Sequence, residues 1–166
     1  TSALIGIAID QGYIASTQVK FYDLFDFPGY DNWDARKADM TLEDALTMRL
    51  GLTWDEWSSP YGSPQNDLSK LQANNVDWPK ALLDLPVAYN PGAVFAYNTA
   101  ASIAIGQALQ NATGMRMEIF ANTYLFYPMQ ITDAQWSLTP TGLSNGGSGL
   151  FLKTRDLAKF GQLYLN

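Results

Sequence analysis

The segment from Asn98 to Asn111 carries the strongest helical pattern of the sequence, and the architecture of the chain must accommodate it. Apolar side chains recur there at Ile103, Ile105 and Leu109, and Gly114 follows as a helix stop. Helical patterns also dominate the other segments, whereas stretches with strand character are few and short. With 166 residues, about the size of one domain, the chain is long enough to bury a core.

Further helices are predicted from apolar spacing and from capping residues. Thr41 is an expected N-cap with Asp44 three residues later, which is a variant of the capping box. A second capping box at residues 132–135 predicts another helix start, and the apolar run at residues 93–97 predicts a short strand. The predicted helices cover residues 2–11, 41–48, 67–74, 77–85 and 115–129, with a last helix from residue 154.

Histidine and cysteine are both absent from the sequence. Without histidine, the chain cannot itself supply Ser-His-Asp or Cys-His catalysis, or a histidine metal site. Without cysteine, it has no disulfide, no zinc thiolate and no thiol nucleophile. We therefore expect no metal site and no cofactor in this chain.

The balance of charge excludes one class of partner. Lys and Arg total 10 against 16 Asp and Glu, which gives a net charge of -6. Such a chain has little to replace the counterions of phosphates, so nucleic acid is not an expected partner. The apolar run at residues 1–9 is far shorter than the ~20 residues of a membrane span, so no span is expected. The oligomeric state stays open.

Both ends of the sequence carry interrupted helical patterns. Residues 1–9 resemble the later half of a buried helix that ends near Gly12, and Leu157, Phe160 and Leu163 recur at helical spacing close to the last residue. We therefore expect an internal fragment of a longer protein, forming a single partial domain over residues 1–166. A natural short chain with processed ends is the alternative.

Motifs of nucleophilic and acid–base catalysis are sparse. The pattern G-x-S-x-G fails at residues 146–150 because Leu150 stands in place of the second glycine. No lysine follows a serine by three residues, so S-x-x-K is absent. Asp55 and Glu56 are adjacent, and adjacent side chains point in different directions. They are therefore not expected to flank one glycosidic bond.

Tyr97 is a candidate catalytic group because of its position. It ends the predicted strand and stands directly before Asn98, at the start of the strongest helix. A tyrosine acts as a general base only where a neighbouring cation lowers its pKa from about 10. The alternative is an ordinary half-buried tyrosine, one of the 9 in the chain.

Four sequence blocks, in order, resemble those of serine beta-lactamase-like (penicillin-binding-protein-like) proteins. The branch concerned contains class C beta-lactamases, esterases and 6-aminohexanoate-dimer hydrolases. Residues 1–4 are similar to the end of the family's S-x-x-K-S-F-T-S-A-L helix, and residues 40–52 to ITIxxLLTMTSGL. Residues 91–99 resemble PGTxFxYSN, and residues 146–161 resemble GGGLxxTxRDMAKFG. Each block alone is weak evidence, but together they cover essentially the whole chain.

The resemblance implies a fold class. Proteins of this family have an antiparallel sheet flanked by helices, built from both chain ends, and a mostly helical lobe. The chain is then expected to be a helix-rich α+β fragment of this beta-lactamase/transpeptidase-like fold. It would hold the helical lobe and the tyrosine block, with most of the antiparallel sheet missing. Apolar surface would be left uncovered.

The resemblance also implies a serine hydrolase that forms an acyl-enzyme on a small ester or amide substrate. The family's Y-x-N motif falls on residues 97–99, so Tyr97 would be catalytic and would act with a lysine to deprotonate the serine. That Ser and Lys would lie just before Thr1, and a third motif would lie past residue 166, so this chain alone is expected to be inactive. Thr99 would bind substrate through its hydroxyl, where the family most often has Asn, Ser or Asp.

The loop between the matching blocks adds two candidate substrate-binding residues, Trp57 and Tyr61, near Trp54. Such loops can rim the substrate cleft in this family. The alternative is that the aromatic side chains anchor a long loop. The glycines of residues 146–149 are expected to serve close backbone packing rather than catalysis.

Two other functions are compatible with the sequence. Thr99, Arg49 and Leu50 depart from the family pattern, which indicates a non-catalytic binding or regulatory relative that kept the fold. The aromatic and acidic residues 54–57 indicate, more weakly, a carbohydrate-binding module. The resemblance favours a bacterial protein that is periplasmic or secreted, with the cytoplasm as the alternative.

Overall fold

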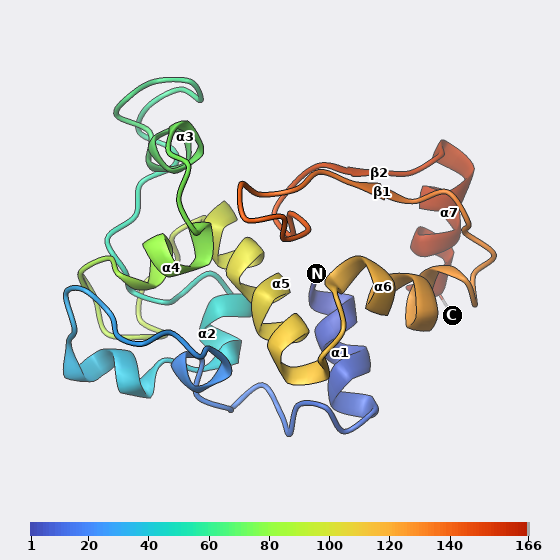
Figure 1. The fold of residues 1–166 in the computed structure, drawn as a ribbon, viewed down its shortest axis with the longest axis horizontal. Coiled ribbons are helices and arrows are strands. Elements are labelled where there is room, and N and C mark those ends of the chain that lie inside the picture. The colour runs from blue at the N-terminus through green and yellow to red at the C-terminus, as the bar shows by residue number, and fades with distance from the viewer. Residues whose placement is uncertain (166) are drawn as a thin grey trace.

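Helix α5 (Thr99–Thr113) lies at the centre of the computed structural model, which describes residues 1–165 (Figure 1). Its N-cap is Asn98, whose side chain accepts a hydrogen bond from the amide of Ala101 at 2.9 Å. It ends at Gly114, which adopts the left-handed conformation at φ 69°. Most of the α5 side chains are buried, so the predicted helix is confirmed and forms the middle of the core.

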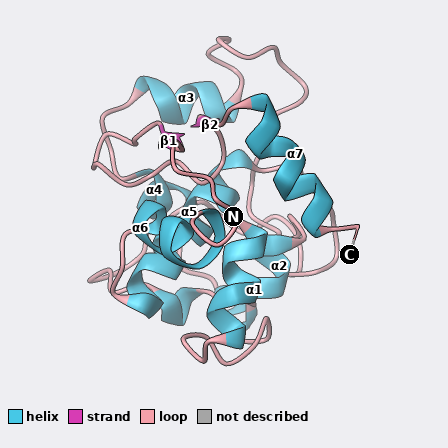
Figure 2. Ribbon diagram, turned by 90° about the vertical axis from the view of Figure 1, so that its right-hand side faces the viewer, coloured by secondary structure: helices cyan, strands magenta, loops and turns pink. Residues whose placement is uncertain are grey.

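Four helices pack around α5, as the view in Figure 2 makes plain. They are α1 (Ser2–Asp10), α2 (Leu42–Leu46), α4 (Trp78–Leu83) and α6 (Met117–Ala121). A single apolar cluster joins them, because each helix turns its apolar side chains toward α5. The largest of its fully buried apolar side chains are Phe21, Phe120, Ile5, Met40, Leu42, Leu82, Leu83, Ile103, Leu109, Met117 and Ile131.

The remaining elements lie around this bundle. Helix α3 (Asp67–Ala73) lies near α4 at one end of the molecule (Figure 1), and 3-10 turns occupy Tyr22–Leu24 and Ala35–Asp39. Helix α6 continues into a π-helical turn at Asn122–Phe126. At the other end lie strands β1 (Gln135–Trp136) and β2 (Leu150–Phe151), followed by α7 (Thr154–Leu163). The strands are antiparallel, with Gln135 opposite Phe151 and Trp136 opposite Leu150.

Capping patterns predicted most helix boundaries well. At α2, the Thr41 hydroxyl accepts from the amide of Asp44, and the Asp44 carboxylate accepts from the amide of Thr41, so the capping box is confirmed. The helix is shorter than predicted, because Met48 takes a left-handed conformation at φ 58°. The predictions for α1, α3, α4 and α7 are confirmed within about two residues.

Two local predictions are wrong. Residues 93–97 are an irregular segment, because no strand among residues 1–165 pairs with them to form a ladder. The capping pattern at residues 132–135 starts no helix. Gln135 pairs with Phe151 in the two-stranded sheet instead, so a tertiary pairing overrides the local capping signal.

The two strands and α7 leave large apolar side chains exposed, as expected for a helix-rich α+β fragment with little sheet. Phe151 is 63% exposed, Leu157 58% and Tyr164 67%. Within residues 1–165, no helix has the length and apolar character needed to cross a bilayer.

Candidate active site

Tyr97 lies at the end of the loop that leads into α5. The amide of Ala96 donates a hydrogen bond of 2.9 Å to the carbonyl oxygen of Met48, and Asn98 caps α5 directly after Tyr97. The Tyr97 side chain is half-buried, and its ring lies beside Trp57. The ring centroids are 5.3 Å apart, with the ring planes at 57°. Tyr97 is therefore held by the backbone on both sides and by an aromatic contact on its ring.

A buried carboxylate, Glu56, lies at the first turn of α5. It is only 2% exposed, and its two oxygens each accept two hydrogen bonds. Oε2 accepts from the amide of Thr99 at 2.8 Å and from the indole of Trp54 at 3.1 Å. Oε1 accepts from the hydroxyl of Thr99 at 2.5 Å and from that of Tyr61 at 3.1 Å. An ionised carboxylate has about four lone-pair sites, so these donors occupy all of them.

The position of Glu56 suits a negative charge. The first amides of a helix have no partners within the helix, and they carry the positive end of its dipole. Asn98 satisfies one of these amides in α5 and Glu56 satisfies another, that of Thr99. Thr99 is only 6% exposed, and its hydroxyl is used in the contact with Glu56.

The loop around Glu56 is closed by the fully buried side chain of Asn66. Its Nδ2 donates to the carbonyl oxygens of Glu56 and Ser59, each at 3.0 Å. Its Oδ1 accepts from the amide of Ser69 at 3.0 Å and so caps α3. The loop is therefore anchored both to the start of α5 and to the start of α3.

Trp57 and Tyr61 are exposed aromatic residues of this loop, with 69% and 58% of their surfaces exposed. The pKa of Tyr61 is raised above its ordinary value, first by its partial burial and then by its hydrogen bond to Glu56 and the proximity of Tyr97. Asp55 is exposed whereas Glu56 is buried, so these adjacent carboxylates lie in different surroundings. Its Oδ1 accepts from the amides of Ser58 and Trp57, and these bonds lower its pKa.

A glycine-rich loop packs closely on the opposite part of the same helical turn. A Cβ atom added to Gly147 would lie 2.6 Å from the carbonyl oxygen of Thr99, and one added to Gly146 would lie 2.6 Å from that of Ser102. The hydroxyl of Thr1, at the start of α1, donates to the carbonyl oxygen of Gly146 at 2.6 Å. The expectation that these glycines serve close backbone packing is confirmed.

The structure brings the four candidate site residues together at the start of α5. Tyr97 and Trp57 are in contact, and Tyr61 and Thr99 share the Glu56 carboxylate. Sequence reasoning missed Glu56 as part of this group. The available signal was an acidic residue between two tryptophans, but its partner Thr99 lies 43 residues away in the chain. Within residues 1–165, no three acidic side chains lie close enough together to hold a metal ion.

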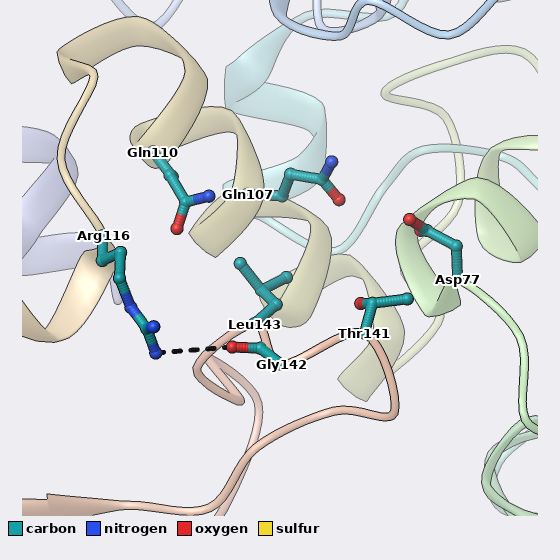
Figure 3. A pocket seen from close by; sticks show the side chains of 7 residues that line it. All are labelled: Asp77, Gln107, Gln110, Arg116, Thr141, Gly142 and Leu143. Carbon is teal, nitrogen blue, oxygen red and sulfur yellow. Dashed lines mark hydrogen bonds between the residues drawn. The ribbon is translucent and has the colours of Figure 1, made fainter.

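A separate polar cavity of about 340 Å³ lies along the C-terminal half of α5, away from Tyr97 (Figure 3). Gln107 and Gln110 line one side of it, and Thr141 lines another. Arg116 donates to the carbonyl oxygen of Gly142 at 3.5 Å. Because Arg116 also forms an ion pair with Glu118, its charge is already compensated.

Comparison with known proteins identifies the family. The family profile described as Beta-lactamase matches residues 28–166. The chain belongs to the beta-lactamase family. Its members are serine hydrolases, so the resemblance carried by the four sequence blocks is confirmed at the level of the superfamily. None of the curated proteins matches the sequence.

Solved structures of the same fold belong to this superfamily. A beta-lactamase/D-alanine carboxypeptidase from Yersinia pestis matches with a TM-score of 0.72 at 16% identity, over 98% of this chain and 50% of that one. A penicillin-binding protein from Bacillus halodurans matches with a TM-score of 0.70 at 16% identity, over 98% and 56%. A putative 6-aminohexanoate-dimer hydrolase from Bacillus anthracis matches with a TM-score of 0.66 at 19% identity, over 99% and 44%. The chain thus spans about half the length of these proteins and has the fold of the part that it matches.

Proposed function

We propose that the whole protein is a serine hydrolase that cleaves an ester or amide through an acyl-enzyme, with Tyr97 as a catalytic residue. The observation that carries this proposal is the position of Tyr97. Its half-buried ring lies against that of Trp57, and the residue stands directly before Asn98, the N-cap of α5. A group that transfers a proton requires such a fixed side-chain position, because a displacement of about 1 Å can lower the reaction rate ~100-fold.

The glycine loop supports the position proposed for the serine and the lysine. Thr1 donates to Gly146, and Gly147 lies against Thr99, so the starts of α1 and α5 share this loop. In the proposal, a Ser-x-x-Lys that ends two residues before Thr1 extends α1 at its start and brings both side chains toward Tyr97. The lysine ammonium is then the cation that a tyrosine base needs.

The proposed chemistry has two stages. The serine oxygen bonds to the substrate carbonyl carbon, and its proton passes to the Tyr97–lysine pair. The pair then protonates the leaving alcohol or amine as its bond to that carbon breaks. A water molecule, deprotonated by the same pair, next attacks the acyl carbon. The bond between that carbon and the serine oxygen breaks, the pair returns the proton to the serine oxygen, and the acid leaves. Trp57 and Tyr61 would form an aromatic wall for the substrate, and Thr99 would border it.

The test uses the full-length protein with a fluorophosphonate probe, which labels an activated serine, and an activated aryl ester as substrate. We expect one labelled site, and Tyr97→Phe should lower the rate of ester hydrolysis by about 10²–10⁴-fold, as for loss of a general base. The matched control is Tyr127→Phe, since Tyr127 is 56% exposed and lies outside the site. A folded full-length protein that is neither labelled nor active would refute the proposal.

One observation favours a second function, that of a non-catalytic binding relative. The Thr99 hydroxyl is committed to Glu56 in this structure, whereas the proposed hydrolase would use position 99 toward substrate. The same probe separates the two functions. Binding of a substrate analogue to the full-length protein without labelling would favour the binding relative.

A further inference from the structure

We propose that Glu56 is a positioning residue for Tyr97, a role that rests on the proposed hydrolase function. It accepts hydrogen bonds from two parts of the chain that meet at Tyr97. One is the first turn of α5, through the amide and hydroxyl of Thr99. The other is the aromatic loop, through the side chains of Trp54 and Tyr61.

Glu56 acts on Tyr97 from two sides. Thr99 is two residues after Tyr97, so its bonds to Glu56 fix the backbone that leaves Tyr97. Trp57 is the residue after Glu56, and its ring packs on the ring of Tyr97. A single carboxylate therefore sets both the backbone position and the aromatic neighbour of the proposed base.

A carboxylate suits this arrangement, because it accepts from all four partners at once. A glutamine can keep its oxygen toward the amide of Thr99 and the indole of Trp54, but its NH₂ group then faces the hydroxyls of Thr99 and Tyr61. Those hydroxyls must turn to accept, and the charge-assisted hydrogen bonds become neutral and weaker. Glu56→Gln is thus a nearly isosteric change that weakens the hold on Thr99 and on the aromatic loop.

The carboxylate does not take part in the chemistry itself. Glu56 is 2% exposed, and its lone-pair sites are occupied by protein donors, so no substrate atom can reach it. Its effect on the chemical step therefore passes through Tyr97, and it should appear more strongly in the rate of that step than in substrate affinity.

The experiment compares Glu56→Gln with wild type in the full-length protein, with rates normalised to fluorophosphonate-titrated sites so that unfolded molecules do not count. We expect kcat to fall by about 10-fold or more, KM to change by a smaller factor because Tyr61 also borders the proposed substrate site, and the pH profile of kcat to shift. Glu43→Gln is the matched control, since Glu43 is an exposed glutamate that also accepts side-chain hydrogen bonds, from Thr17 and Gln18. It should leave all three quantities unchanged.

A second measurement does not depend on activity. The protein is labelled with 3-fluorotyrosine, and the ¹⁹F resonance of Tyr97 is assigned by its absence in Tyr97→Phe. Glu56→Gln should shift or broaden this resonance, whereas Glu43→Gln should not. If wild type hydrolyses nothing, the hydrolase proposal fails, and this resonance still decides whether Glu56 positions Tyr97.

Unchanged kcat, pH profile and Tyr97 resonance in folded Glu56→Gln would overturn the inference. If that variant does not fold, Thr99→Val and Tyr61→Phe replace it, because each removes one donor to Glu56. Both should perturb the Tyr97 resonance to a smaller degree. A wild-type resonance in both variants would equally overturn the inference.

Discussion

The amide and the hydroxyl of Thr99 donate to opposite oxygens of Glu56, 43 residues earlier in the chain, at 2.8 and 2.5 Å. This double contact ties the start of the central helix to the loop that Asn66 anchors to α3. It also turns the Thr99 hydroxyl inward. The start of α5 is thus a rigid platform, and Tyr97 projects from its edge.

We expect Thr99→Val to lower the stability of the full-length protein. The change keeps the shape of the side chain but removes a donor to a buried carboxylate, which costs about 1.5–3 kcal/mol. Urea unfolding gives the free energy directly. Thr123→Val is the control, because the exposed Thr123 hydroxyl donates only to the carbonyl oxygen of Ile119, and a change within about 0.5 kcal/mol is expected. Equal midpoints for the two variants would contradict the prediction.

Gly147→Ala should destabilise the protein by about 1–3 kcal/mol, as overpacking does. The new methyl group would lie 2.6 Å from the carbonyl oxygen of Thr99, and backbone must move to admit it. Gly6→Ala in α1 provides the contrast, since its added Cβ meets nothing within 4 Å. There we expect a gain of about 1 kcal/mol from helix propensity. Thermal unfolding of both variants measures the difference, and the same sign for both would refute this account.

The lowered pKa of Asp34 predicts that the folding stability of the protein decreases at acid pH. Its hydrogen bonds and ion pair with Arg36 lower its pKa from 3.8 to about 2. Because the folded pKa lies below the unfolded one, this contribution is complete above the unfolded value. It is lost as the pH falls from about 4 toward 2. NMR titration of the Asp34 carboxyl should give a pKa near 2, and Arg36→Met should return it toward 3.8. An unchanged Asp34 pKa in that variant would exclude Arg36 as the cause.

The phenol of Tyr61 reports on Glu56 independently of any reaction. Burial raises the Tyr61 pKa, and so do the hydrogen bond to Glu56 and its negative charge. In Glu56→Gln the charge is gone, so the Tyr61 pKa should fall toward 10 while the contribution of burial remains. ¹³C NMR of the tyrosine Cζ atoms measures it, with Glu43→Gln as the unchanged reference. An unchanged Tyr61 pKa in Glu56→Gln would show that the Glu56 carboxylate does not raise the pKa of this phenol.

Local chemistry in the sequence was sufficient to predict most helices. Thr41 with Asp44, and Gly114, act on their own neighbours in the chain, so their signals do not depend on the tertiary fold. The segment at residues 93–97 has apolar side chains of strand type but pairs with no strand within residues 1–165. Whether such a segment becomes a strand depends on tertiary pairing, which its own composition does not encode.

Some residues of the candidate site could likewise be predicted from the sequence, and one could not. The position of Tyr97 before a strong helix, and the aromatic residues Trp57 and Tyr61, could be selected from the sequence. Glu56 could not, because a buried carboxylate and an exposed one look alike until their donors are known. Its donors come from the loop at residues 54–61 and from Thr99, and only folding brings these together.

The contact of Gly147 with the carbonyl oxygen of Thr99 also limits how this protein can evolve. A lineage that acquires a side chain at position 147 must tilt the first turn of α5 or move the loop outward. A tilt of α5 displaces Thr99, which is only two residues after Tyr97. Selection on the position of Tyr97 would therefore also act on position 147, and glycine can persist there without touching any ligand.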